Sequence, residues 1–451
     1  MGISVGQKHL VVGVDYTHDG LGVAKIDGRT IFVQNLIIGE EAEVEITFVK
    51  KNFLIGKISK LITKSPDRIQ PLCPVATACG GCQFQHVSYE KELEYKKNKV
   101  LRAFHNIAHI DIEAAEVLGS ENPYYYRNKT IMPIGYDRHR KLIHGFYKAR
   151  THDIVAIDQC YIEDKRGSLI LKTIKGLMTE YALTPYDEET LKGDIRRIMI
   201  RTSYYYDDLM VVIVTNNEKP VNFEPFISAL ISQHPEITTL IQNINGEDTN
   251  VVLGSKEKIF LGEGKIKDKL CGLDFNISSK SFYQINVKQT EKLYQKAIEL
   301  ADLKDNHIVL DAYSGIGTIG MAVSKHVKNV IGVEVVKQAV IDAKENARIN
   351  NIKNVKYYED DASDFLVKMA KAETKFDVVF VDPPRKGLDQ KFTETLLEIM
   401  PKRIVYISCD PATLARDVAL LSQKYSINKL VVVDMFSRTY HVESIVQLTL
   451  K

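Results

Sequence analysis

Apolar and polar residues alternate through the first sixty positions, as in half-buried β-strands. The alternation is clear in 10–14, 29–33 and 42–49, and glycines interrupt it at positions 20, 28, 39 and 56. Five short strands of this kind predict a small β-barrel. The pattern ends near Thr63-Lys64-Ser65-Pro66, where the first domain boundary is expected.

The last third of the chain has another pattern, in which short apolar runs alternate with amphipathic, helix-like segments. This order predicts an α/β domain with a largely parallel sheet, whose active site lies at the carboxyl ends of the strands. The expected strands are His307–Leu310, Asn329–Val333, Val355–Tyr358, Phe376–Val381 and Arg403–Ser408.

A glycine-bearing turn follows the first of these strands. The segment Gly315-Ile316-Gly317-Thr318-Ile319-Gly320 has the GxGxxG spacing, whose glycines let the backbone approach a ligand closely. Glu334 ends the next strand, about where an acidic residue would bind ribose hydroxyls. A nucleotide-like cofactor is indicated, NAD is open at this point, and a turn without any ligand is the structural alternative.

Two further strand ends carry reactive groups. Cys409 follows an apolar run and precedes Asp410-Pro411, which places its thiol at a strand's carboxyl end as a candidate nucleophile. A lone cysteine is also commonly an inert core residue. Asp382 is followed by two prolines, which hold a polar group at the sheet edge in a stiff loop or simply make a turn.

Four segments in this order resemble the RNA uracil-5-methyltransferase family, and most closely its bacterial 23S ribosomal RNA members that carry an iron-sulfur cluster. The resemblance implies a Rossmann-like class I methyltransferase domain that uses S-adenosylmethionine. The segments are Asp311-Ala312-Tyr313-Ser314-Gly315-Ile316-Gly317-Thr318, Asp382-Pro383-Pro384-Arg385-Lys386-Gly387, Ser408-Cys409-Asp410-Pro411-Ala412-Thr413-Leu414-Ala415-Arg416-Asp417 and His441-Val442-Glu443.

The resemblance also implies roles for individual residues. Cys409 would add to carbon 6 of uracil, and Glu443, which starts an antiparallel last strand beside Cys409, would remove the carbon 5 proton. S-adenosylmethionine would be bound by Gln284, Tyr313, Glu334 and Asp382, with Asp361 as a further candidate at the adenine end. The chain departs from many relatives at Asp410, where Asn is frequent, and at Ser437, where Pro is common.

The six cysteines point to a second site. Cys73, Cys79 and Cys82 form a Cys-x5-Cys-x2-Cys cluster around two glycines, with Cys160 as a distant fourth ligand. Four thiolates suit either zinc or an iron-sulfur cluster. The resemblance favours a 4Fe-4S cluster, while Cys271 fits no ligand pattern and is expected in the core.

Composition sets the wider frame. The 451 residues suggest about three domains, and 45% hydrophobic residues are ordinary for globular proteins. The sequence has no 18-residue apolar run or targeting segment, which predicts a cytoplasmic protein without a membrane partner or an evident obligate protein partner. The net charge is only +2, so RNA binding must be argued from local patches.

Two basic segments with aromatic residues are candidate RNA-binding patches. Residues 49–64 hold five lysines and no acidic residue, in a region that resembles the OB-like TRAM domain; Lys50, Lys51 and Lys57 are the preferred phosphate contacts. Residues 124–150 hold seven basic residues and one acidic residue, with Arg127 and Phe146 preferred for splayed bases. A solvated lysine face and half-buried sheet tyrosines are the structural alternatives.

The sequence thus predicts three domains: an OB-like TRAM barrel (1–64), a central α+β RNA-binding domain with the cluster (65–278) and a methyltransferase domain (279–451). Ser88–Phe104, rich in Lys and Glu, predicts a surface helix, although in relatives a corresponding excursion, here about 88–110, packs on the catalytic domain. The expected function is methylation of carbon 5 of uridine in 23S ribosomal RNA. The same reaction on the transfer RNA T-loop is the alternative, followed by an NAD oxidoreductase and a non-enzymatic RNA-binding protein.

Overall fold

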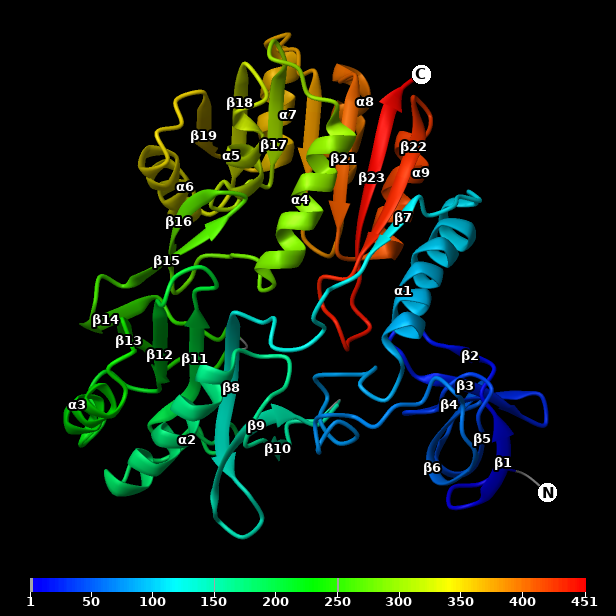
Figure 1. Cartoon of the computed structure of the whole chain (residues 1–451), viewed down its shortest axis with the longest axis vertical. Helices are drawn as coiled ribbons and strands as arrows, with labels where there is room; N and C mark the ends of the chain where they lie inside the picture. Colours follow the sequence, from blue (N-terminus) through cyan, green and yellow to red (C-terminus); the bar gives the residue numbers. More distant parts are fainter. Residues whose placement is uncertain (1–2, 150, 250) are drawn as a thin grey trace.

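The computed structural model describes residues 3–149, 151–249 and 251–451, and these build three large sheets. Figure 1 shows the C-terminal sheet at the top, the middle sheet below it in green and the N-terminal sheet in blue beside the middle one. In the described part of the chain, none of the helices combines the length and apolarity that a membrane crossing needs.

The N-terminal sheet has six strands, one more than the pattern predicts, because the short Asp15–Tyr16 also pairs. Alternate residues of its longest regular strands are buried, and Ile31, Val44 and Leu54 are fully covered at its centre. In sheet order the strands are β1 (Lys8–Val12), β5 (Glu41–Val49), β6 (Phe53–Thr63), β4 (Arg29–Val33), β3 (Gly22–Ile26) and β2 (Asp15–Tyr16).

The C-terminal sheet has eight strands. Five of its strands, from β19 to β21, run parallel, and β23 lies antiparallel between β21 and β22. The family resemblance implies such an antiparallel last strand. In sheet order they are β19 (Val355–Glu359), β18 (Asn329–Glu334), β17 (Ile308–Ala312), β20 (Val378–Val381), β21 (Arg403–Ser408), β23 (Glu443–Leu450), β22 (Tyr425–Val433) and β7 (Glu116–Leu118).

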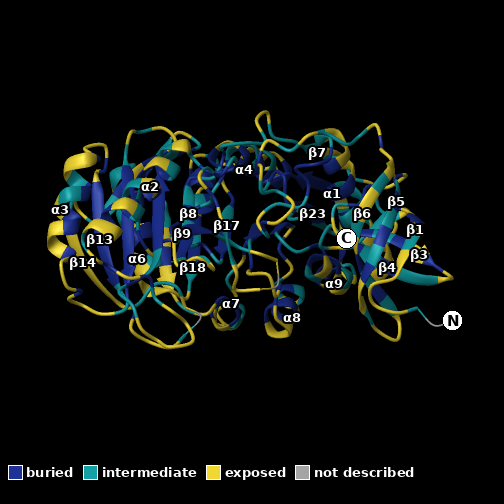
Figure 2. Ribbon diagram, turned by 90° about the horizontal axis from the view of Figure 1, so that it is seen from below, coloured by how far each residue is buried: buried dark blue, intermediate teal, exposed yellow. Residues whose placement is uncertain are grey.

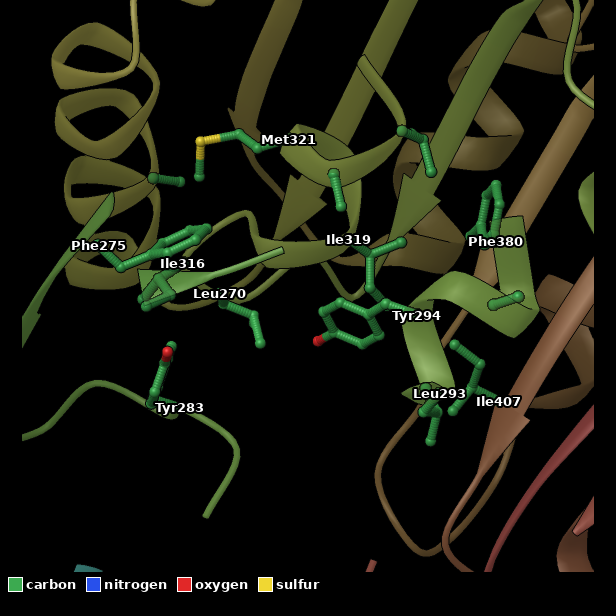
Figure 3. Packing of buried hydrophobic residues seen from close by; sticks show 14 of the residues in the cluster. Leu270, Phe275, Tyr283, Leu293, Tyr294, Ile316, Ile319, Met321, Phe380 and Ile407 are labelled. Carbon is green, nitrogen blue, oxygen red and sulfur yellow. The ribbon is translucent and has the colours of Figure 1, made fainter. Parts of the chain in front are cut away.

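Helices cover both faces of this sheet, because successive side chains of a strand point to opposite faces. In β20, Val378 and Phe380 belong to one core cluster, and Val379 and Val381 belong to another. The first cluster packs under α4 (Val287–Ala301), α5 (Thr318–Ser324) and α6 (Lys337–Ile349). The second packs under α7 (Ala362–Lys371), α8 (Gln390–Ile399) and α9 (Pro411–Leu421). Figure 3 shows part of the first cluster, with Leu293 of α4 near Ile407 of β21.

A segment from the first quarter of the chain joins this C-terminal unit. Helix α1 (Tyr89–Ala103) continues into a π-helical turn, Phe104–Ala108, and Val100 and Phe104 are buried in the second cluster. Strand β7 then pairs parallel with β22 at the sheet edge, as Figure 1 shows. The expectation of a surface helix is therefore wrong for one face of α1, which the C-terminal unit covers.

The middle sheet packs against α2 (Lys165–Glu180) and α3 (Phe223–Gln233). In Figure 2 its strands are largely dark blue, and exposed residues lie on the outer surfaces of the helices. A separate hairpin, β15 (Lys265–Leu270) and β16 (Leu273–Ser278), buries Ile266 and Phe275 against α4 and α6. The order is β10 (Ile154–Ala156), β9 (Leu142–Tyr147), β8 (Lys129–Tyr136), β11 (Ile195–Thr202), β12 (Leu209–Thr215), β13 (Thr239–Ile244) and β14 (Lys256–Leu261). The domain boundaries after residues 64 and 278 stay predictions.

Candidate active site

Cys409 stands between the end of β21 and the start of α9. The helix begins here because the Asp410 carboxylate accepts hydrogen bonds from the amides of Ala412 (2.9 Å) and Thr413 (3.1 Å), and Pro411 occupies the first turn. The Asp at this position, which departs from the common Asn, is thus a helix cap. The cap fixes the partly exposed thiol at the carboxyl edge of the sheet.

Glu443 reaches the same edge from the opposite chain direction. It opens β23, whose next residue, Ser444, pairs with Ser408 of β21. The antiparallel strand therefore starts where the parallel strands end, and Glu443 is buried there. The structure brings Cys409 and Glu443 into one neighbourhood, where the Glu443 charge acts on the thiol.

The loop after β20 carries Asp382, the third ionisable group of the site. Its shape is fixed by α9: the Thr413 hydroxyl donates to the Arg385 carbonyl (3.2 Å), and the Arg416 guanidinium donates to the Lys386 carbonyl (2.9 Å). The loop amide of Leu388 also donates to the Asp417 carboxylate (2.8 Å). The Asp-Pro-Pro segment is therefore held rigidly beside Cys409.

The electrostatics of these three groups oppose their ionisation. Burial, then the charges of Glu443 and Asp382, raise the pKa of Cys409 to about 12. Burial and Asp382 raise the pKa of Glu443 well above its usual range, and burial raises that of Asp382 to about 7. Arg385 acts in the opposite direction on both Cys409 and Glu443. A cation placed among these groups would favour their charged forms.

The glycine turn after β17 presents unused polar atoms. The Gly315 amide donates to Glu334 (3.0 Å), and the Gly320 amide donates to one oxygen of Asp311 (2.8 Å). The other Asp311 oxygen and the Ser314 hydroxyl are buried and have no partner among the described residues. Burial, Asp382 and Glu334 raise the pKa of Asp311 to about 8. Asp311 belongs to the motif at the end of β17, but no local pattern assigns it a role.

Four of the five predicted cofactor residues follow neighbouring strands. Tyr313, Glu334 and Asp382 lie at the ends of β17, β18 and β20, and Asp361 caps α7 just after β19 by accepting from two amides, 2.9 and 3.1 Å away. Burial, Asp389 and Asp361 raise the pKa of Tyr313. Gln284 lies before α4, and its carbonyl accepts from Asn128 (3.0 Å).

The four predicted metal ligands gather in a separate buried region. Cys79 and Cys160 belong to one small core cluster, against which Cys82 packs, and the charge of Cys73 acts on Cys79 and Cys82. Burial raises the pKa of all four thiols, that of Cys82 to about 12. Within residues 3–149, 151–249 and 251–451, no three or more His, Cys, Asp or Glu side chains are arranged to hold a metal ion.

The proposed RNA contacts differ in their exposure. Lys50 and Lys51 are exposed, as is Lys57, which pairs with Glu45 (3.2 Å). Arg127 is partly exposed, whereas Phe146 packs against two core clusters. Arg150, at the end of the second basic segment, lies outside the described residues.

A cavity of about 700 Å³ opens above Cys409. Arg385, Cys409 and His441 line one side of it, together with the start of α9. Other walls come from α1, from the π-helical turn after it, and from β2 and loops of the N-terminal domain. Sequence reasoning missed these walls, because the residues come from segments that have no local motif. The thiol is thus reached from a cleft that three distant parts of the chain share.

A parallel sheet with a glycine turn, and with acidic groups around a thiol at its carboxyl edge, suits an enzyme that binds a nucleotide-like cofactor. Residues 88–451 match the tRNA (uracil-5-)-methyltransferase family, and residues 10–59 match the TRAM domain. The chain belongs to this uracil-5-methyltransferase family. It is an RNA uracil-5-methyltransferase with an N-terminal TRAM domain.

Individual relatives agree over nearly the whole length. A protein of Staphylococcus aureus (strain MSSA476) named as an uncharacterized RNA methyltransferase is 43% identical over 97% of both chains. One of Clostridium tetani with the same description is 44% identical over 95% of this chain and 94% of its own. The solved Pyrococcus abyssi tRNA (uracil-54, C5)-methyltransferase, in complex with S-adenosyl-L-homocysteine, has a TM-score of 0.79 and 29% identity and covers 97% of this chain and 99% of its own.

Proposed function

We propose that the protein methylates carbon 5 of a uridine in 23S ribosomal RNA through a covalent adduct between Cys409 and uracil carbon 6. The observation that carries the mechanism is the clustering of the partly exposed Cys409 with Asp382 and the buried Glu443, near the exposed Arg385. S-adenosylmethionine, when bound, supplies both the methyl group and a positive sulfonium. Asp382, Glu334 and the unpartnered oxygen of Asp311 suit such a cationic, hydroxyl-bearing donor.

The protein groups account for each covalent step. The Cys409 thiolate bonds to carbon 6, and the displaced electron pair makes carbon 5 nucleophilic enough to accept the methyl group. Ionised Glu443 then takes the carbon 5 proton; the resulting electron pair re-forms the 5,6 double bond and expels the thiolate. Both groups must be ionised to act, and the nearby Arg385 favours their charged forms.

Substitution of the two groups tests this assignment. Glu443→Gln should accumulate a protein-RNA adduct that survives denaturing gels, because addition proceeds while elimination is slowed. Cys409→Ala should form none, and Cys271→Ala, a cysteine in the β15–β16 hairpin, is the matched control. An adduct that persists in Cys409→Ala would refute the nucleophile.

The RNA class is supported by the cysteine spacing, which resembles that of the 23S ribosomal RNA enzymes. The solved relative acts on tRNA, as its name states, and this favours the T-loop uridine as the second candidate. Transfer of labelled methyl groups into matched 23S ribosomal RNA and transfer RNA fragments distinguishes them. Label in transfer RNA alone would overturn the ribosomal assignment.

We also propose that Cys73, Cys79, Cys82 and Cys160 hold a 4Fe-4S cluster. Their burial in one region fits such a group, and cluster cysteines bind different irons, so their sulfurs need not converge on one point as around zinc. When bound, the cluster would cross-link residue 160 to the loop of residues 73–82. Each thiol must lose its proton to bind iron, and the iron would then balance the negative charge of the thiolates.

Metal analysis tests the cluster. Protein purified without oxygen should contain about four irons per chain and absorb broadly in the visible range. Cys79→Ala should lose both signals, and Cys271→Ala should keep them. Stoichiometric zinc without visible absorption would contradict the cluster.

For RNA capture we propose Lys50, Lys51 and Lys57 of the N-terminal domain as phosphate contacts, with Arg127 and Phe146 of the central domain selecting bases. The exposure of the three lysines supports their part, although Lys57 must leave Glu45 to contact phosphate. Phe146 would have to move out of its packing to stack on a base. Of the two base-selecting residues, Arg127 therefore has the stronger support.

A further inference from the structure

The cavity above Cys409 extends well beyond the reacting groups. One face of α1 lines it at helical spacing, through Lys91, Tyr95, Asn98 and Arg102, and the N-terminal sheet supplies Tyr16 and Ile38. A volume of about 700 Å³ lies within the upper part of the range, about 300 to 1,000 Å³, of pockets that enclose whole ligands. A uracil base at Cys409 would leave unfilled the part of the cavity that lies between α1 and the N-terminal sheet.

Most charges in this outer part are already neutralised. Arg102 binds both carboxylate oxygens of Asp15 (2.7 and 2.9 Å), and Lys91 binds Glu94 (2.8 Å). These pairs join the N-terminal sheet to α1 or stay within α1. They leave few cations free for a ligand.

Lys99 is different. Its ammonium donates to the Tyr440 carbonyl (2.9 Å) and lies 4.9 Å from the centre of the Tyr440 ring, and no carboxylate of the described residues is within ion-pair distance. Burial lowers the pKa of Lys99 to about 8, while Asp410 partly opposes this. The charges of Asp410 and Asp19 act on Lys99, but it forms no direct ion pair with a carboxylate of the described residues. A cation that is partly removed from water and lines the same cavity as Cys409 is suited to a phosphate.

The same cavity contains an apolar wall. Ile38 of the N-terminal sheet is 45% exposed, and Ile107 of the π-helical turn is 43% exposed, although both line an interior cleft. Apolar surface that is exposed to water in the free protein is unfavourable, and the flat face of a base would cover that surface. Apolar surface and an unpaired cation in one cleft match the two parts of a nucleotide.

We infer that this cleft binds a second nucleotide of the RNA, next to the target uridine, with its phosphate on Lys99 and its base against Ile38 and Ile107. The inference rests on the proposed function, because it takes the target base to lie at Cys409. It makes the N-terminal domain a wall of the substrate site as well as an RNA-capturing module. Sequence preference beside the target would then depend on residues far from the methyl-transfer motifs.

The phosphate contact can be tested with a short RNA substrate in which single phosphates around the target are replaced by neutral methylphosphonates. In the wild type, one replacement should raise the KM for RNA about tenfold or more, the effect of losing a hydrogen bond between charged groups. Lys99→Gln should raise KM similarly with the unmodified RNA and be insensitive to that replacement. The slope of log KM against log salt should flatten by about 0.7.

Three variants separate this role from a structural one. Lys99→Arg should restore much of the KM, Lys97→Gln, the neighbour outside the cavity, should behave as wild type, and the KM for S-adenosylmethionine should stay unchanged in all. Ile107→Ser should weaken binding of the intact RNA but not of one made abasic at the neighbouring position. Equal sensitivity of wild type and Lys99→Gln to every methylphosphonate would overturn the inference. Absence of methyl transfer by the wild type to any RNA would instead refute the proposed function.

Discussion

The buried charges under α1 permit a quantitative prediction for Lys96→Met. Lys96, Glu92 and Asp434 have fully buried side chains; the Lys96 ammonium contacts Glu92 (2.8 Å), Asp434 and the carbonyl of Phe436 (3.1 Å). Arg438 supplies the second cation of the group, 3.5 Å from Glu92. Two cations thus face two carboxylates, and methionine would leave two carboxylates with one cation.

Breaking a buried ion pair by removing one partner costs about 3 to 5 kcal/mol. The equilibrium constant for opening this contact should therefore rise roughly 150- to 5,000-fold. Even with Lys96 present, burial raises the pKa of Glu92 to about 7. The variant should partly relieve the cost by protonating Glu92.

Urea unfolding and amide hydrogen exchange measure the effect. Because the charged group ties α1 directly to residues 434–441, faster exchange in those residues should appear before global unfolding. Lys97→Met is the matched control, and Asp434→Asn added to Lys96→Met should recover stability by removing the unpaired charge. A cost below about 1 kcal/mol, the range of exposed ion pairs, would refute the reasoning.

Further predictions concern the Cys409 thiol, the α9 cap and the lysines of the N-terminal domain. Alkylation of Cys409 by iodoacetamide in the free enzyme should accelerate about tenfold per pH unit from pH 7 to 9 without a plateau, since its pKa is raised to about 12; peptide mapping that showed a plateau near pH 8 would contradict this. Glu443→Gln should accelerate it by removing a negative charge. Asp410→Ala should cost about 1 kcal/mol in thermal unfolding through loss of the α9 cap, and Asp410→Asn far less; equal losses would exclude capping. Neutralising Lys50 and Lys51 should flatten the salt dependence of RNA binding by up to about 0.7 per lost phosphate contact, with an unchanged slope as the contrary result.

Several parts of the fold follow directly from local patterns. The strands around the active site were predicted within a few residues, because buried parallel strands are continuous apolar runs. The α1 helix itself was also expected. Its packing on the C-terminal unit is expected only from the family resemblance, because Lys and Glu usually indicate solvent. Here Glu92 and Lys96 compensate each other one turn apart and meet Asp434 and Arg438 in the core.

The chain order and the apolar runs are enough to place the candidate side chains at the sheet edge, because short motifs at strand ends fix which side chains reach it. Cys409, Glu443 and Asp382 were candidates before any contact was known. Only the tertiary structure decided what surrounds them: β7 at the sheet edge, the raised pKa of the thiol, and the cleft with Lys99 and Ile38. These features depend on contacts such as that between Lys96 and Asp434, which are 338 residues apart. Local periodicity indicates helices and strands but does not predict contacts between residues so far apart.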